Sequence, residues 1–167
     1  INAHNHIYSA FARGLSIKGY NPKNFSDILE GMWWTIDRKL THENNRLSAY
    51  AVYVDCIKNG VTTVFDHHAS YCDIPGSLDD LAEAARALGV RTNLCYEVSD
   101  RDGEIKMRQA VEENARMIAL AEKDETDMLK GMMGLHASFT LSDETLALCK
   151  KYTPATTGFH VHVAEGS

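Results

Sequence analysis

The sequence is poor in the features that mark membrane, nucleic-acid-binding and disulfide-stabilised proteins. No run approaches the about 18 consecutive apolar residues that a membrane-spanning helix needs. The 17 lysines and arginines form no basic stripe of the kind that binds phosphate backbones. The four cysteines show neither a CxxC pair nor a zinc-finger spacing. We therefore expect no membrane and no nucleic-acid partner, and free thiols in a reducing cytoplasm.

Proline is also scarce, at three of 167 residues, whereas 44% of the residues are hydrophobic, so the chain can bury a core. Apolar spacing predicts helices and strands in alternation. The expected strands are 2–6, 61–67, 90–98, 128–136 and 159–164, and the expected helices are 24–40, 41–59, 77–88, 104–123 and 142–152. Residues 77–80 resemble a capping box. Strands separated by helices predict an α/β fold with a parallel sheet.

Polar side chains that can bind metal follow the ends of the expected strands, where the active sites of parallel α/β sheets gather. His4-x-His6 places two imidazoles on one side of a strand, so both can bind one ion. His160-x-His162 repeats this pattern in the last strand, and Glu165 follows close enough to turn back as a proton carrier. Each motif alone also fits a surface pair or a buried polar cluster. Two motifs at equivalent strand ends favour a metal site.

Three segments together resemble the amidohydrolase superfamily: residues 2–6 (Asn-Ala-His-Asn-His), 134–136 (Gly-Leu-His) and 162–165 (His-Val-Ala-Glu). Within it they resemble the branch of cytosine, guanine and adenosine-type deaminases and triazine chlorohydrolases. Two further segments are similar to the SsnA-type aminohydrolases associated with selenium metabolism: residues 32–38 (Met-Trp-Trp-Thr-Ile-Asp-Arg) and 64–70 (Val-Phe-Asp-His-His-Ala-Ser).

The resemblance implies a (β/α)₈ barrel with one divalent metal ion, zinc or iron. It implies an enzyme that hydrolyses a C–N or C–Cl bond of a heterocyclic, amidine-like small molecule through a metal-activated water. His4, His6 and His162 are implied as the metal ligands, because the HxxE spacing to Glu165 selects His162. His160 is then expected to pack inside the barrel. Glu165 is implied as the catalytic proton shuttle.

Several other polar residues near the strand ends are candidates for the same pocket. The resemblance implies that His136 contacts the substrate. Asp66, His67 and His68 are candidates for substrate binding or for hydrogen bonds that orient a metal ligand. A purely structural cluster at the strand end explains these three equally well. We expect the charged residues within 97–101 to solvate the rim of the pocket.

The length of the chain sets an expectation about how much of the barrel it forms. A closed (β/α)₈ barrel usually needs about 250 residues, and the superfamily pattern includes a sixth-strand histidine, an eighth-strand aspartate and a small flanking β-domain. We therefore expect residues 1–167 to be part of a single barrel domain, about strands one to five, without those segments. Because open strand edges favour pairing with another chain, we also expect a homo-oligomer.

Two alternatives stay open beside the mononuclear enzyme. The first is a binuclear amidohydrolase acting on cyclic amides, which would need a carbamylated lysine at the end of the fourth strand. Lys130 lies toward the start of that strand, so the mononuclear hypothesis is favoured. The second is a non-catalytic metal-binding or interaction domain.

Overall fold

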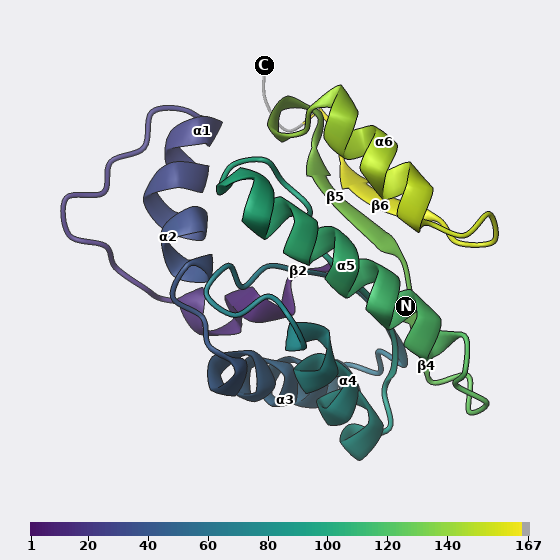
Figure 1. Ribbon diagram of the computed structural model, residues 1–167. Helices are drawn as coiled ribbons and strands as arrows, with labels where there is room; N and C mark the ends of the chain where they lie inside the picture. Colours follow the sequence, from purple (N-terminus) through teal and green to yellow (C-terminus); the bar gives the residue numbers. More distant parts are fainter. Residues whose placement is uncertain (165–167) are drawn as a thin grey trace.

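The computed structural model describes residues 1–164 and shows parallel strands with helices packed over one side (Figure 1). Four strands pair in chain order, and two further strands pair with each other. They are β1 (Asn2–Asn5), β2 (Thr63–His68), β3 (Arg91–Tyr96), β4 (Leu129–Gly131), β5 (Met133–Ala137) and β6 (Phe159–His162). A parallel bridge from Val98 to Leu135 links the second group to the end of β3. This is the order of consecutive strands in a (β/α)₈ barrel, so the predicted fold is confirmed.

The helices between the strands lie close to the predicted ranges. They are α3 (His42–Lys58), α4 (Ser77–Leu88), α5 (Gly103–Ala121) and α6 (Asp143–Tyr152), with short 3₁₀ segments η1 (Ile7–Ala12) and η3 (Ser138–Thr140). Helix α3 begins at Thr41, whose hydroxyl accepts the Asn44 N–H while the Asn44 side chain accepts the Thr41 N–H. The apolar sides of the helices pack on the strands around fully buried Tyr53, Leu81 and Leu94.

The expected helix 24–40 forms with an irregular middle. It consists of α1 (Phe25–Ile28), a π-helical turn η2 (Leu29–Trp33) and α2 (Trp34–Asp37). Gly31 lies in this turn, and a Cβ there would meet the Tyr20 ring at 2.8 Å. A π-turn adds a residue to the helix and rotates the side chains that follow. The segment therefore presents both of its tryptophans to one pocket, described below.

The expected single strand 128–136 is wrong in one respect: it breaks at Met132 into β4 and β5. Just past the break, the buried side chain of Asn114, from α5, bonds to both β3 and β5. Its Oδ1 accepts the N–H groups of Tyr96 (2.8 Å) and Gly134 (3.2 Å), and its Nδ2 donates to the Tyr96 carbonyl (2.8 Å). A Cβ at Gly134 would stand 2.2 Å from that carbonyl oxygen, so only glycine permits this approach.

The capping box expected at residues 77–80 is also wrong. Gly76 is the N-cap of α4, with φ of 83°, and it has no side chain that could accept a hydrogen bond from the first turn of the helix. The carboxylate of Glu113 on α5 accepts the N–H groups of Gly76 and Leu78, each at 3.0 Å. A tertiary contact therefore replaces the local cap that the sequence suggested.

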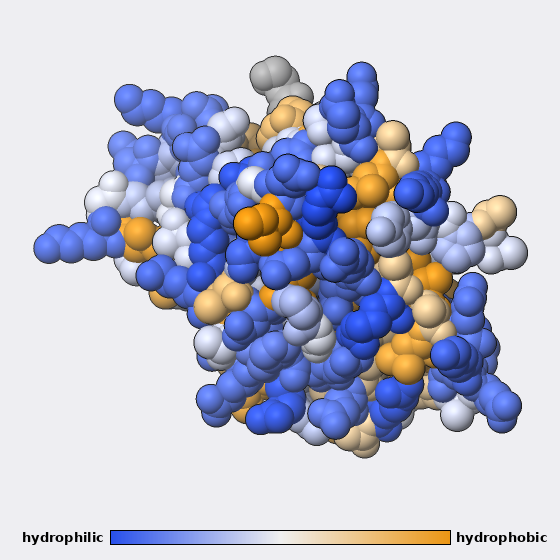
Figure 2. All heavy atoms as spheres, viewed as in Figure 1, coloured by the Kyte–Doolittle hydropathy of each residue, from blue (hydrophilic) through white to orange (hydrophobic). Residues whose placement is uncertain are grey.

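The face covered by the helices is mostly hydrophilic, with apolar side chains gathered beside α5 and α6 (Figure 2). Within residues 1–164, no helix combines the length and the apolar character needed to cross a bilayer.

Candidate metal centre

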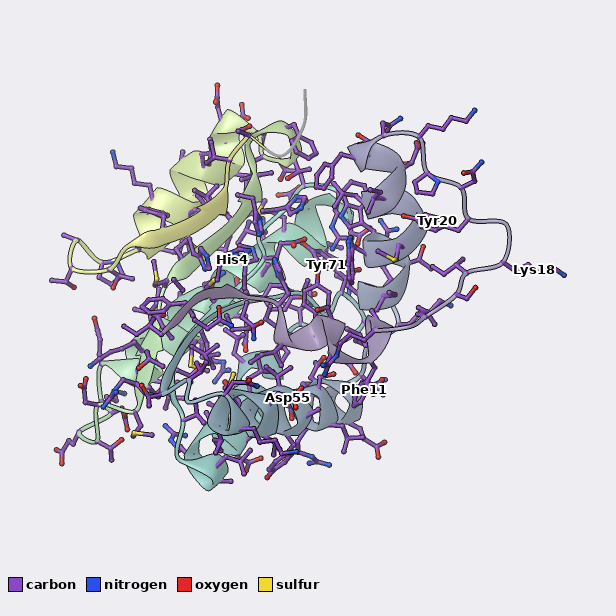
Figure 3. All side chains as sticks on the ribbon, turned by 180° about the vertical axis from the view of Figure 1, so that it is seen from behind. His4, Phe11, Lys18, Tyr20, Asp55 and Tyr71 are labelled. Carbon is purple, nitrogen blue, oxygen red and sulfur yellow. The ribbon has the colours of Figure 1, made fainter. Side chains whose placement is uncertain are left out.

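The two HxH motifs meet in space. β1 carries His4 and His6, and β6 carries His162, so strands more than 150 residues apart contribute to one cluster. The Nε2 atom of His6 lies 3.1 Å from that of His4 and 3.3 Å from that of His162. Figure 3 labels His4 on β1, in a view from the side opposite to that of Figure 1. The three histidines predicted as ligands therefore come together.

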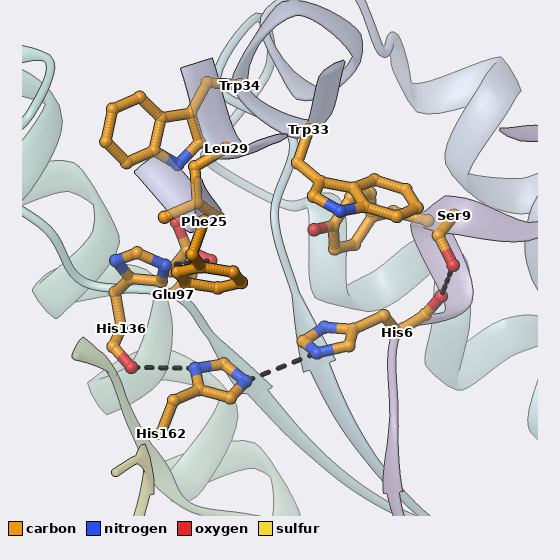
Figure 4. Close-up of a pocket in the computed structure, with 10 residues that line it drawn as sticks. His6, Ser9, Phe25, Leu29, Trp33, Trp34, Glu97, His136 and His162 are labelled. Carbon is orange, nitrogen blue, oxygen red and sulfur yellow. Dashed lines mark hydrogen bonds and ion pairs between the residues drawn. The ribbon is translucent and has the colours of Figure 1, made fainter. Parts of the chain in front are cut away.

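Hydrogen bonds fix the orientation of two of these rings. His6 Nδ1 lies 2.8 Å from the carbonyl oxygen of His67. His162 Nδ1 lies 2.7 Å from the carbonyl oxygen of His136, a bond that Figure 4 draws as a dashed line. A carbonyl only accepts, so each Nδ1 carries the proton and each Nε2 presents a lone pair to the cluster. This arrangement, with the distal nitrogen held by a backbone acceptor, is typical of histidines that bind metal.

The donor set fits a divalent transition-metal ion. A tetrahedral site with metal–nitrogen bonds of about 2.0–2.1 Å has nitrogen–nitrogen separations of about 3.3 Å, close to the two spacings observed. Burial lowers the pKa of His6 to about 4, against the opposing effect of its bond to the His67 carbonyl. The ring is thus neutral at pH 7, the form that coordinates metal. Imidazole nitrogens suit zinc and iron.

A pocket of about 180 Å³ opens over His6 and His162 (Figure 4). One wall is apolar and comes from the irregular helix, whereas the floor is polar. The lining residues are His6, Tyr8, Ser9, Phe25, Leu29, Trp33, Trp34, Glu97, His136 and His162. An apolar wall facing a few convergent polar groups is typical of small-molecule sites. The expected contact between His136 and a substrate is consistent with this position and stays a prediction.

His136 has a defined orientation in the pocket. Its Nδ1 lies 2.7 Å from the Thr140 hydroxyl oxygen, and that hydroxyl lies 3.0 Å from the Ala137 carbonyl, to which it donates. The Thr140 oxygen therefore accepts from His136 Nδ1, and His136 Nε2 faces Glu97 at 4.0 Å. The Trp34 ring stands edge-on to the imidazole, with centroids 6.2 Å apart.

A buried ion-pair network stands behind this wall. Arg101 bonds to Glu97 Oε1 at 3.1 Å and to both carboxylate oxygens of Asp37, and its guanidinium stacks on the rings of Tyr71 and Trp34. Glu97 is 3% exposed and Asp37 is 1% exposed. Burial raises the pKa of Asp37 to about 7, against the lowering effect of Arg101. The expectation that these charges solvate the rim is wrong for Glu97 and Arg101.

The sequence does not predict this ion-pair network, because its partners are distant along the chain. Glu97 and Arg101 are four residues apart, which sequence can register, but Asp37 joins them only through the fold. In contrast, Asp100 bonds to Ser142 N–H and to the Thr145 hydroxyl, so it ties β3 to α6 and takes no part in the network's described contacts.

The other predicted residues lie behind the cluster or outside the description. Asp66 Oδ1 accepts the N–H of Ile7 at 2.6 Å, which fixes the end of β1. His67 supplies the carbonyl for His6, and His68 Nε2 lies 2.9 Å from the Ser70 hydroxyl. The described lining of the pocket does not include these three side chains. Glu165, the predicted proton shuttle, lies outside the described residues.

Curated relatives match nearly the whole chain. It is 27% identical over 166 residues to a 5'-deoxyadenosine deaminase of Methanosarcina barkeri, covering 99% of this chain and 36% of that protein. It is 28% identical over 151 residues to a 5-methylthioadenosine/S-adenosylhomocysteine deaminase of Thermococcus onnurineus, covering 90% and 32%. The chain therefore spans about a third of the length of these relatives.

Two solved structures share the fold. An atrazine chlorohydrolase from Arthrobacter aurescens TC1, complexed with zinc, matches with a TM-score of 0.66 at 20% identity, over 90% of this chain and 37% of that one. A guanine deaminase of E. coli matches with a TM-score of 0.74 at 18% identity, over 98% and 37%. In addition, residues 1–167 match the sequence profile of the amidohydrolase family.

Proposed function

Because the chain belongs to the amidohydrolase family along its whole length, we propose that the protein containing it is a mononuclear metal-dependent hydrolase. It acts on a C–N or C–Cl bond of a heterocyclic, amidine-like small molecule. The observation that carries this proposal is the convergence of three imidazole Nε2 atoms, with spacings of 3.1 and 3.3 Å, two of which belong to residues that line a small pocket, His6 and His162.

His4, His6 and His162 would hold the ion, zinc or iron. When bound, such an ion supplies a Lewis acid and a water of lowered pKa. The chain's own residues orient the ligands: the carbonyls of His67 and His136 hold two rings with their lone pairs toward the ion. Glu165 is proposed as the proton carrier from its HxxE spacing alone.

The pocket wall suits a planar ring. The tryptophan, phenylalanine and leucine side chains of the segment 25–34 offer an apolar face, and His136 Nε2 with Glu97 offers a polar edge. A heterocycle stacked on the wall would turn its ring nitrogens toward that edge. Adenosine derivatives, which the names of the two relatives give as substrates, are one class with this chemistry.

The position of Lys130 favours one metal ion over two. Its side chain is 54% exposed, and its ammonium bonds to Asp127 at 2.7 Å. A bridging carbamate would require this side chain among the ligand histidines instead. We therefore prefer the mononuclear enzyme to the binuclear alternative.

Finer parts of the proposal rest on the sequence motifs. These are membership of the SsnA-type group associated with selenium metabolism, a cytoplasmic location, and a homo-oligomeric state. Among residues 1–164 all four cysteines are free, as a reducing compartment requires.

Metal analysis of the purified protein tests the proposal first. We expect about one zinc or iron per chain and loss of that ion in His6→Ala. His42→Gln is a matched control, because His42 is bonded to Asp80 on α4. An ammonia-release and chloride-release screen over purines, pyrimidines, pterins and triazines then identifies the substrate. Two ions per chain would support the binuclear alternative, and an ion without turnover of any heterocycle would support the binding domain.

A further inference from the structure

The third ligand differs from the other two in what holds its ring. His6 and His162 each direct Nδ1 at a backbone carbonyl, whereas His4 Nδ1 lies 2.9 Å from another side-chain nitrogen, Nε2 of His160. His160 precedes His162 by two residues on β6, so both rings lie on the same side of the strand. The sequence suggested only that His160 fills space inside the barrel.

The contact continues into the core. His160 Nδ1 lies 3.5 Å from the Cys95 sulfur, and Cys95 Sγ in turn lies 3.3 Å from the carbonyl oxygen of Asp66, to which it donates. Cys95 is 1% exposed. A chain of polar contacts therefore runs from His4 through His160 on β6 and Cys95 on β3 to the backbone carbonyl of Asp66 on β2.

The two ends of this chain of contacts determine which atom donates the proton at each step. For His4 Nε2 to present a lone pair to an ion, His4 Nδ1 must carry the proton and donate to His160 Nε2. A neutral His160 then carries its proton on Nδ1 and donates to the Cys95 sulfur. The Cys95 thiol donates onward to the Asp66 carbonyl. Every donor has one acceptor, and every ring stays neutral.

We propose that His160 and Cys95 are positioning residues for the metal ligand His4, in the role that backbone carbonyls fill for His6 and His162. This inference rests on the proposed metal-dependent function and deepens it. His160 selects the tautomer of His4 and fixes its ring angle, and Cys95 selects the tautomer of His160. Loss of such supporting contacts typically weakens metal affinity about 10- to 100-fold.

A competing use of the same residues is a second ion site. Cys95, His160 and His67 also form a set of three metal-capable side chains, with sulfur–nitrogen distances of 3.5 and 3.7 Å. A tetrahedral zinc site would have about 3.6 Å for such a pair. However, a neutral His160 bound through Nδ1 would carry its proton on Nε2, facing His4. His4 would then be protonated on Nε2 and lost to the first ion, so the two uses exclude each other.

The test is the metal affinity of the full-length protein, measured by competition with a chelator, together with the absorption spectrum of its cobalt(II) form. We expect His160→Leu to weaken binding about 10- to 100-fold. His160→Gln, whose carbonyl can accept from His4, should recover most of that loss. Val161→Ala, at the 41% exposed neighbouring position of β6, is the matched control and should bind like the parent.

Cys95→Ala and Cys95→Ser provide a second pair that disturbs the core less. The alanine variant should weaken binding in the same direction as His160→Leu, by a smaller factor, whereas serine keeps a donor and an acceptor and should bind more tightly than alanine. The cobalt(II) spectrum of the parent should lack sulfur-to-cobalt absorption.

Four results would overturn the inference. Parent-like affinity in His160→Leu, with metal loss in His6→Ala intact, would refute it and leave the proposed function standing. Equal losses in the leucine and glutamine variants would show a structural role only. Two ions per chain with sulfur-to-cobalt absorption would assign Cys95 as a ligand. A parent that binds no ion at all would refute the proposed function along with it.

Discussion

Helix α4 depends on a carboxylate from another helix, and this dependence can be measured. We expect Glu113→Ala to lower the free energy of unfolding by about 3–6 kcal/mol. Glu113 accepts two backbone N–H groups, and each charge-assisted hydrogen bond contributes about 1.5–3 kcal/mol. Its ion pair with Arg116 adds little, at most about 1 kcal/mol, because Arg116 is 41% exposed.

Urea unfolding followed by circular dichroism measures the change. Glu112→Ala is the matched control, since Glu112 is an exposed carboxylate on the same helix, and we expect a change within about 0.5 kcal/mol there. Glu113→Gln keeps one acceptor oxygen and should lose about half as much as the alanine variant. A loss below about 1 kcal/mol in Glu113→Ala, or one equal to that of the control, would refute the capping role.

Three further predictions concern the strand break, the buried histidine and the ion-pair network. Gly134→Ala should destabilise the protein by at least about 3 kcal/mol, measured as a fall in Tm, because its Cβ would stand 2.2 Å from the Tyr96 carbonyl oxygen. A normal Tm would contradict it. Burial lowers the pKa of His68 to about 3, so the stability that the neutral ring contributes is complete above about pH 6.5 and is lost as the pH falls toward 3. At about pH 4.5 the loss is about 3 kcal/mol in the free energy of unfolding. Urea unfolding at several pH values should show a weaker loss of stability in acid for His68→Gln. Arg101→Leu should cost about 3–5 kcal/mol in urea unfolding, since it leaves two buried carboxylates without their cation; a parent-like midpoint would argue against the network.

Some of the candidate site was accessible from sequence because it depends on local periodicity. Residues two apart on a strand share a side, so a shared ion for His4 and His6 could be predicted without knowledge of the fold. The alternation of strands and helices placed His162 at an equivalent strand end. The structure brings these three Nε2 atoms together as expected.

Other parts depend on contacts that no local pattern encodes. Trp34 reaches the pocket because a π-turn precedes it in the helix. Glu97 is buried beside Arg101, which also pairs with Asp37 on a distant helix. The charged stretch looked like a solvated rim because sequence reports charge but not the partner that neutralises it. Pairing with a distant opposite charge makes such burial tolerable.

The sequence by itself determined the order of the elements and the parallel α/β class, because these follow from periodicities of two and 3.6 residues. It also predicted which histidines lie together, from the HxH spacing and from the family resemblance. Tertiary structure decided how those groups are held. Asn114 bonds to β3 and β5, Glu113 caps α4, and His160 lies between His4 and Cys95. Each of these is a contact between polar groups distant in sequence, and polar groups that are partly or fully buried take whichever partner the packed chain brings within reach.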